Sequence, residues 1–398
     1  MGIAGKRARR FADRRDDIID VASALLNSEG AQGLRLADVA SKVGLDISSL
    51  GYYFPKKDAL VAACLERSIN WLERSVAEAA QEADERAKVA ALIDAQFALF
   101  ARQNAGGTQL ALLSDLPSIA DGARKPLEEN LDKAVRTIAG FFPAGTPGRS
   151  RAEQLLASNI LASNIFWLPA WQYGCSPKDY ARTSRNLVDL FDLGFLNDFR
   201  ETGEIPSLEL DAGQKDARTA FLEAATRLIN RYGHNGAKVE RIAAELGLSS
   251  GSFYHHLRTK SELVVACFEA SFDVFERAFA LAGSEGTQGA SLATATSAIA
   301  MYQLTADAPL LRIGSYQILP DELRRDMFTR STQLVNRVAG MISDGIADGS
   351  VRHCDPRIAA QYYLATVHGF SDLRDWSSGE DAPRLVSKLL HALAKGAI

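Results

Sequence analysis

The chain has 398 residues, of which 47% are hydrophobic and 24% charged, and its formal net charge is −4. This length allows two or more domains with separate cores, and the composition is that of a soluble globular protein. The sequence contains no signal peptide and no apolar run near the roughly 20 residues of a membrane span, so we expect no membrane contact and a cytoplasmic location. Its four cysteines and six histidines show no metal-binding spacing, and it has no nucleophile motif or phosphate loop, so neither a cofactor nor an enzyme is predicted.

Residues 1–15 form a basic arm in which Asp13 is the only acid. Its cations are Lys6, Arg7, Arg9, Arg10, Arg14 and Arg15. Such an arm can neutralise DNA phosphates or enter a minor groove, and it can also be a disordered, solubilising tail. Its place directly before a helix-turn-helix pattern favours contact with DNA, through Arg7, Arg9 and Arg10.

Helical periodicity dominates the rest of the chain, and no alternating strand pattern occurs. Turn residues separate the amphipathic stretches of the first half, which cover 16–30, 36–43, 47–53, 57–81, 87–104, 126–142, 151–173 and 178–199. A polar linker at 201–216 follows, and the plan is repeated from about residue 217. The sequence therefore predicts an all-α protein.

A gap-free internal repeat is the most informative feature of the chain. Residues 18–66 recur at 221–269 with an offset of 203, and 15 of the 49 aligned positions are identical. Weaker matches continue at this offset, at Pro117 with Pro320, Val135 with Val338 and Trp167 with Phe370. A period this long indicates a duplicated domain rather than a solenoid. We predict a basic arm (1–15), a first head (16–66), a first helical body (67–200), a linker (201–216), a second head (217–269) and a second body (270–398).

Each head shows the pattern of a helix-turn-helix. In the first copy Ala40 is the small residue that lets two helices cross closely, and Gly44 suits the positive φ of a tight turn. Val39, Leu45 and Leu50 close the small core. The second copy repeats these positions as Ile242, Ala243, Gly247, Leu248 and Phe253. Other helical hairpins use one such pattern, whereas two copies in register indicate two DNA-binding heads.

The second copy resembles the TetR (tetracycline repressor-like) family of regulators. Its stretch 247–257 (GLSSGSFYHHL), followed by Lys260 and Leu263, is similar to the recognition helix of that family and the start of its fourth helix. One departure is Leu257, where the family usually has an aromatic residue.

The first copy, 44–54 (GLDISSLGYYF) with Lys57, is less similar to the family. Gly51 replaces a tyrosine that typically touches a phosphate, and Asp46 replaces a small hydroxyl residue. A glycine inside this helix costs about 1 kcal/mol of helix stability relative to alanine, and a carboxylate repels phosphate. We therefore expect the first head to read fewer bases than the second, on an operator that is an imperfect palindrome.

The resemblance implies which side chains face DNA. In the first head these are Arg35, Ser48, Ser49, Tyr52, Tyr53 and Lys57. In the second they are Lys238, Ser249, Ser250, Ser252, Tyr254, His255 and Lys260. Hydroxyls and lysines can hold phosphates, and a helix N-terminus offers free N–H groups to an anion. Some aromatic residues can instead seal the head, and we favour that role for Tyr53, Phe54, His256 and Leu257.

The bodies end in helices that, in the family, pair across a two-fold axis as a four-helix bundle. The matching segments are 151–173 with 178–199, and 355–376 with 381–396. We expect them to pack on each other within the chain as a pseudo-dimer, whereas pairing with a second molecule would give four heads. The predicted seam residues are Leu155, Ile160, Leu161, Phe166, Leu385, Leu389 and Leu393.

Bodies of this family usually hold a small-molecule pocket. Candidates in the first body are Phe97, Phe100, Trp167 and Trp171; in the second they are Tyr302, Arg312, Tyr316, Tyr362, Tyr363, His368 and Phe370. Any one of these aromatic residues can equally belong to a core, whereas Arg312 and His368 could orient an acidic or hydroxylated ligand. Cys64 and Cys267 occupy equivalent positions, where a buried apolar role is favoured over a redox sensor.

Together these features predict a single-chain transcriptional regulator that binds double-stranded DNA and is released from it, as a repressor, by a small apolar or aromatic effector. The alternative is a constitutive DNA-binding or scaffold protein with one degenerate head and no ligand sensing.

Overall fold

A computed structural model describes residues 3–145, 149–171, 174–197, 208, 217–233, 238–247, 259–283, 286–306, 308–312, 316, 319–373 and 381–398. Within these ranges the chain is helical, and the one extended pairing is an isolated antiparallel bridge between Leu196 and Val351. The predicted all-α fold is confirmed.

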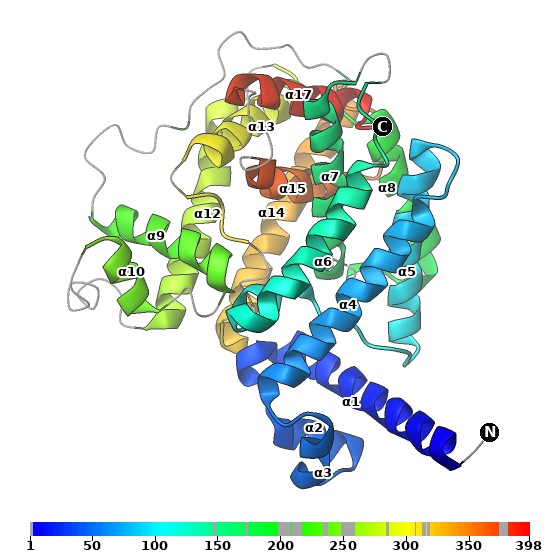
Figure 1. Ribbon diagram of the computed structural model, residues 1–398. Coiled ribbons are helices and arrows are strands. Elements are labelled where there is room, and N and C mark those ends of the chain that lie inside the picture. Colours follow the sequence, from blue (N-terminus) through cyan, green and yellow to red (C-terminus); the bar gives the residue numbers. More distant parts are fainter. Residues whose placement is uncertain are drawn as a thin grey trace.

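The two halves follow the same plan (Figure 1). The first half comprises α1 (Ile3–Gly33), α2 (Leu36–Val43), α3 (Ile47–Tyr53), α4 (Lys57–Ala79), α5 (Glu85–Asn104), the 3₁₀ turn η1 (Leu113–Ser118), α6 (Asp121–Ala139), α7 (Arg151–Trp171), η3 (Pro177–Asp179) and α8 (Tyr180–Leu193). The second half comprises α9 (Ala217–Tyr232), α10 (Val239–Glu245), α12 (Lys260–Ala282), α13 (Gln288–Thr305), α14 (Asp321–Ala347), α15 (Pro356–Gly369), η6 (Phe370–Asp372) and α17 (Ala382–Lys395).

The described residues form three hydrophobic cores. One lies inside the first head and a matching one inside the second. The third is shared by both bodies, from Leu72 in α4 to Ala397 at the end of the chain. The core of each head also includes body residues, such as Leu127 and Met327, so the heads pack onto the bodies, which share one core.

The bodies meet in a bundle of α7, α8, α15 and α17, in which residues pair reciprocally. Asn159 donates to the carbonyl oxygen of Gly369 at 3.0 Å, and Trp167 donates to the Gln361 side chain at 2.9 Å. Asn159 and Gln361 are 202 residues apart, as are Trp167 and Gly369. The two contacts therefore occupy equivalent positions in the two halves, as a two-fold axis requires. The axis passes between Asn164 and Thr366, whose side chains hydrogen-bond to each other at 3.3 Å. The intramolecular pseudo-dimer is confirmed.

The ends of α8 and α17 cross in the same reciprocal way. The amides of Phe195 and Leu196 donate to the carbonyl oxygen of Leu393 at 2.7 and 3.1 Å. The amides of residues 397 and 398 donate to the carbonyl oxygen of Phe191 at 2.7 and 3.2 Å. Each crossing needs a glycine of positive φ, Gly194 (61°) or Gly396 (93°), where a Cβ would collide with the backbone of the opposite helix.

The constant offset of 203 is wrong beyond the heads. Helices α6 and α14 match at an offset of 200, at which the buried Leu127 corresponds to the buried Met327. Val338 is buried, but Val135 is only half-buried, so these two are not equivalent, and neither are Pro117 and Pro320. Loops of different length between the helices change the register, which the short matches did not reveal.

Most of the predicted seam residues are buried, with two differences. Ile160, Leu161, Leu385, Leu389 and Leu393 are at most 2% exposed. Leu155 is half-buried, and Phe166 is 42% exposed and therefore does not close the seam. Small and polar residues line much of this interface instead, because helices α7 and α15 approach closely: a Cβ on Gly369 would collide with Ser163.

Candidate DNA interface

The basic arm is a continuation of helix α1, which begins at Ile3, rather than a separate segment. Phe11 stacks on Tyr53 with ring centroids 4.7 Å apart and meets Tyr52 edge-on at 5.7 Å. Arg14 donates to the carbonyl oxygen of Val43 at 2.6 Å. These contacts fix the arm against the two helices of the helix-turn-helix, so its cations lie beside helix α3.

The helix-turn-helix of head one forms as predicted. Gly44 has φ 68° and ends α2, and the Leu45 amide donates back to the carbonyl oxygen of Ala40 at 2.9 Å. Val39, Ala40 and Leu50 are at most 2% exposed and close the head core. The positive-φ glycine therefore sets the angle between α2 and α3.

Asp46 caps the start of α3 with its own carboxylate. It accepts hydrogen bonds from the Ser49 amide at 2.7 Å, the Ser48 hydroxyl at 2.6 Å and the Ser49 hydroxyl at 3.0 Å. These bonds, first that from Ser48, lower the pKa of Asp46 to about 2, so the carboxylate is ionised at neutral pH. The two hydroxyls predicted to hold phosphate thus donate to an acid of the same helix.

The exposed face of head one has an apolar centre and a cationic surround. Ile47 is 60% exposed and Tyr52 is 78% exposed, whereas Tyr53 is half-buried and Phe54 is buried. The exposed cations around this face are Arg9, Arg10, Arg35, Lys42 and Lys56. Lys57 is half-buried and donates to the carbonyl oxygen of Gln32 at 3.2 Å; Arg7 lies in α1, but its side chain is outside the described residues.

Head two repeats the same scaffold as far as it is described. Ile242 and Ala243 are buried, and Gly247 has φ 66°. Burial, together with the nearby charge of Lys238, lowers the pKa of Lys260 to about 8. Those two lysines therefore lie close together at this head. The remaining predicted contacts, Ser249, Ser250, Ser252, Tyr254 and His255, lie outside the described residues, as do His256 and Leu257.

An asparagine at the same position of the repeat ties each head to its own body. Asn27 donates to the carbonyl oxygen of Leu110 at 2.8 Å and accepts from the Leu112 amide at 2.7 Å. Asn230 makes the same two bonds, both at 3.0 Å, to the matching backbone atoms of the second body. The identity of these two residues in the repeat thus has a structural reason that the sequence did not show.

Each head also touches the body of the other half, through an arginine in the first turn of a body helix. Arg324 in α14 donates to the carbonyl oxygen of Ser28, in head one, at 2.7 Å. Arg124 in α6 lies over the ring of Tyr232, in head two, at 5.7 Å from its centroid. Both arginines pair with the aspartate three residues before them. Each head is thereby held by both bodies.

The predicted ligand-pocket residues of the first body lie in two places. Phe97 and Phe100 pack against Tyr180, at 5.3 and 6.4 Å between ring centroids, inside the shared core. Trp167 lies in the seam, with its ring 4.9 Å from that of His368. The side chain of Trp171 is outside the described residues.

In the second body the predicted pocket residues are also dispersed. His368 lies between Trp167 and Phe275, and burial lowers its pKa to about 4, so it is neutral at physiological pH. Tyr362, Tyr363 and Phe370 are fully buried in the shared core, where Tyr302 packs half-buried. Tyr316 stacks on Phe268 near head two, and Arg312 pairs with Asp372 at 2.6 Å. The structure therefore brings Trp167 and His368 together but does not gather the set around one cavity.

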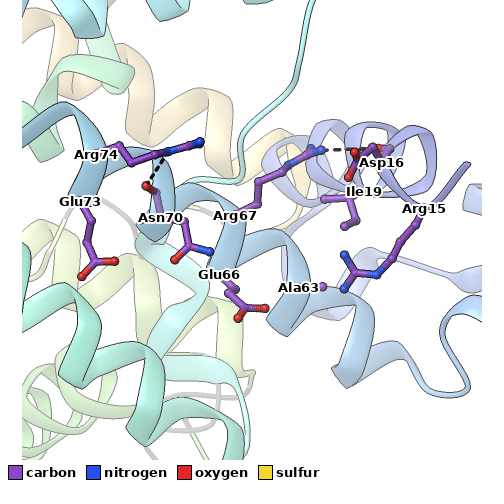
Figure 2. A pocket seen from close by; sticks show the side chains of 9 residues that line it. All are labelled: Arg15, Asp16, Ile19, Ala63, Glu66, Arg67, Asn70, Glu73 and Arg74. Carbon is purple, nitrogen blue, oxygen red and sulfur yellow. Dashed lines mark hydrogen bonds between the residues drawn. The ribbon is translucent and has the colours of Figure 1, made fainter. Parts of the chain in front are cut away.

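Sequence reasoning missed an open pocket of about 440 Å³ between α1 and α4 (Figure 2). Arg15, Asp16, Ile19, Ala63, Glu66, Arg67, Asn70, Glu73 and Arg74 line it. Arg67 spans its inner wall, pairing with Asp20 at 2.8 Å. Both signs of charge alternate along its walls, so it does not favour one class of ligand. The recurring polar residues of α4 were its only sequence signal.

Cys64 and Cys267 are fully buried at matching places in the two heads. Burial raises the pKa of the Cys64 thiol to about 11 and that of Cys267 to about 12. Neither thiol is ionised at neutral pH, in accordance with the predicted apolar role. Among the described residues no group of three His, Cys, Asp or Glu side chains is placed to hold a metal ion, and no helix is long and apolar enough to cross a membrane.

The described residues thus place two similar heads on one pseudo-symmetric helical body, and the helix-turn-helix is described in full in the first head. Comparison with known proteins supports this. Residues 18–64 and 221–267 both match the family described as bacterial regulatory proteins, tetR family. Both heads therefore match the tetR family model, and the chain carries two tetR-type units in tandem.

Among individual proteins, the chain is 35% identical over 72 residues to the HTH-type transcriptional repressor Rv1474c of Mycobacterium tuberculosis. That match spans 18% of this chain and 37% of the relative. Among solved structures, apo AibR is 20% identical, with a TM-score of 0.37, and covers 44% of this chain and 97% of its own. FadR from Bacillus subtilis in complex with stearoyl-CoA is also 20% identical, with a TM-score of 0.36, covering 45% and 98%.

Proposed function

We propose that this chain is a transcriptional regulator that binds two half-sites of one DNA operator with its two covalently linked heads. The observation that carries the proposal is the intramolecular seam, which places two tetR-family heads on a single pseudo-two-fold body. A regulator of this kind needs its heads about 34–36 Å apart to enter successive major grooves on one face of DNA. Because the heads differ at their exposed faces, the preferred operator has two unlike half-sites.

The crossed contacts of the heads support control through head spacing. Head one is held by Asn27 from its own side and by Arg324 of the opposite body, and head two correspondingly by Asn230 and Arg124. A small apolar or aromatic effector that favours a different arrangement of the bodies would change the spacing and release DNA. Coupling of this kind is commonly worth about 1–3 kcal/mol.

A second candidate function is constitutive DNA binding without an effector. It is favoured by the packing of the predicted pocket residues: Phe100, Tyr362, Tyr363 and Phe370 are at most 2% exposed within one continuous core. A body filled in this way acts as a scaffold that holds two heads at fixed spacing.

Selection of bound DNA from a random library with the purified full chain tests the proposal. Two unlike half-sites about one helical turn apart are expected. A half-site that survives Tyr52→Ala but is lost in Tyr254→Ala would restrict base reading to head two, and the absence of any enriched sequence would overturn the proposal. Repeating the selected binding assay with a panel of apolar and aromatic compounds separates the effector-released repressor from the constitutive binder.

A further inference from the structure

Helix α3 of head one presents three side chains to solvent, those of Ile47, Ser48 and Tyr52. Ile47 and Gly51 are four residues apart, as are Ser48 and Tyr52, so the two pairs form neighbouring rows on the helix surface. Leu50, on the opposite side, is fully buried. Ile47 and Tyr52 are two of the seven large hydrophobic side chains that are exposed in the described chain, and Phe11, which touches Tyr52, is a third. The clustering indicates an interaction surface rather than scattered exposure.

The hydrogen-bonding groups on this face do not suit base reading by the usual pairs. Guanine is read by the forked donors of arginine or by lysine, and adenine by the amide of asparagine or glutamine, and α3 (ISSLGYY) contains none of these residues. The hydroxyl hydrogen of Ser48 is directed to Asp46, whose carboxylate already accepts three hydrogen bonds. Gly51 adds no side chain. Apart from the Tyr52 hydroxyl, the helix is left with an aliphatic group and an aromatic ring to offer to a base edge.

We propose that head one recognises thymine bases, through contact of their 5-methyl groups with Ile47 and with Tyr52 in the major groove. The inference rests on the proposed function and adds the base preference of one half-site. The thymine methyl is the one apolar feature of the major-groove edge, and apolar side chains are its usual partners. The ring of Phe11, edge-on to Tyr52 and stacked on Tyr53, holds the Tyr52 side chain in place for this contact.

The charge around the face favours DNA over a protein partner. Exposed Arg9 and Arg10 lie on α1, and exposed Arg35 directly precedes α2. Exposed Lys42 lies in the last turn of α2, and exposed Lys56 is the residue before α4. Head one therefore carries exposed cations that can contact phosphates together with exposed apolar side chains, beside the exposed acids Asp38 and Asp46. Two large side chains on a seven-residue helix also offer too little apolar area for a stable protein interface, which needs about 800 Å² on each partner.

The test replaces thymine by uracil, which lacks only the methyl group. Each thymine of the half-site bound by head one is changed to deoxyuridine in turn, and the dissociation constant is measured for the full chain and for Ile47→Ala. The wild-type chain is expected to lose about four-fold in affinity at one or two positions, the effect of uncovering a single methyl-sized group. Ile47→Ala is expected to bind the two DNAs alike at the position that Ile47 contacts.

Two controls keep the result specific. Deoxyuridine in the half-site bound by head two should lower the affinity of wild type and Ile47→Ala by the same factor. Leu281→Ala, which removes another exposed large apolar side chain, from α12, should keep the full methyl dependence of half-site one.

Wild-type binding that is indifferent to every thymine-to-uracil change in half-site one would overturn the inference while leaving the proposed function intact. An Ile47→Ala variant that binds DNA normally but loses self-association would also overturn it, in favour of a protein interface. Failure of the wild-type chain to bind any DNA would instead overturn the proposed function, and this inference with it.

Discussion

The seam between the bodies and the exposed faces of the heads differ in what the duplication has kept. In the seam several contacts keep a mate at the equivalent position, as the Asn159–Gly369 and Trp167–Gln361 pairs and the backbone bonds at the crossed helix ends do, although the side chains themselves differ. On the heads, Asp46 stands where the second copy has Ser249. Reciprocal packing constrains both halves at once, whereas the outer face of each head is constrained only by what it binds.

The interior of the heads lies between these extremes. Asn27 and Asn230 make the same pair of bonds, and Gly44 and Gly247 have φ values of 68° and 66°. The residues that set the position of the helix-turn-helix are thus retained, and the two heads differ mainly in the residues predicted to face DNA. This is the pattern expected when one chain evolves to read two unlike half-sites.

The largest effect is expected at the crossed helix ends. Gly396→Ala should lower the free energy of unfolding by about 3–5 kcal/mol, because a left-handed conformation and a collision with the backbone of Asp192 act together. Gly349→Ala is the matched control, since Gly349 has φ 82° but no atom within 4 Å of the added Cβ; it should cost only about 1–2 kcal/mol. Equal losses in urea unfolding would show that the crossing does not hold the halves together.

A second, smaller effect is expected at Asp115, where head one meets its body. It distinguishes this junction from the one between head two and the second body. Asp115 is 6% exposed in η1, accepts a hydrogen bond from the Ala31 amide, and burial raises its pKa to about 6. The folded state therefore keeps a proton on Asp115 that the unfolded chain has lost between about pH 4 and 6, so the contribution of Asp115 to stability falls as the pH rises through this range, while that of buried His368 rises. The total loss is on the order of 2–3 kcal/mol.

Asp115→Asn should remove this contribution, so the difference in free energy of unfolding between wild type and variant should change with pH between 4.5 and 6 and be constant above about pH 7, as measured by urea unfolding. The corresponding stretch of the second half, 312–320, contains no acid, so the dependence belongs to head one. Asp58→Asn, at an exposed acid of head one itself, should leave the pH dependence unchanged. An unaltered slope in Asp115→Asn would assign the pH dependence to other groups.

Much of the fold could be predicted from the sequence, because the relevant signals are local. Gly44 and Ala40 mark the helix-turn-helix through backbone conformation and side-chain size, and the repeat doubles their weight. The pseudo-dimer followed from the duplication together with the family resemblance. The register of the seam could not be predicted, since an offset of 202 rather than 203 depends on loop lengths outside the matched segments.

The site was harder to predict, because its geometry depends on contacts between distant segments. That the arm would be helical and would bring Phe11 onto Tyr53 required knowledge of how α1 lies against α3. The engagement of Ser48 and Ser49 by Asp46 is local and could have been anticipated from capping preferences. The predicted pocket residues failed to gather because aromatic residues at helical spacing were buried in a core shared by both halves.

The crossed arginines provide a third test, on the assumption of the proposed function. Arg124→Ala combined with Arg324→Ala should free the heads from the opposite bodies and weaken the preference for the native half-site spacing. The measured quantity is the ratio of the affinity for the selected operator to the affinity for one lengthened by half a helical turn. This ratio should be about ten-fold larger for the wild-type chain than for the double variant. Lys125→Ala with Arg325→Ala, which removes neighbouring exposed charges, is the control. An unchanged spacing preference would mean that the contacts within each half fix the heads.

The smallest predicted effect exchanges one residue between the heads. Asp46→Ser installs the residue of head two, retains a good helix cap, and frees the hydroxyls of Ser48 and Ser49. Removing a carboxylate from the DNA side should tighten binding about three-fold at low salt, with a smaller gain as salt screens the repulsion. Asp132→Ser, at an exposed acid on α6, should have no effect, and the reverse exchange Ser249→Asp should weaken binding by a similar factor. If Asp46→Ser left the affinity unchanged at every salt concentration, the capped end of α3 would not lie against phosphate, and the divergence of head one would need another cause.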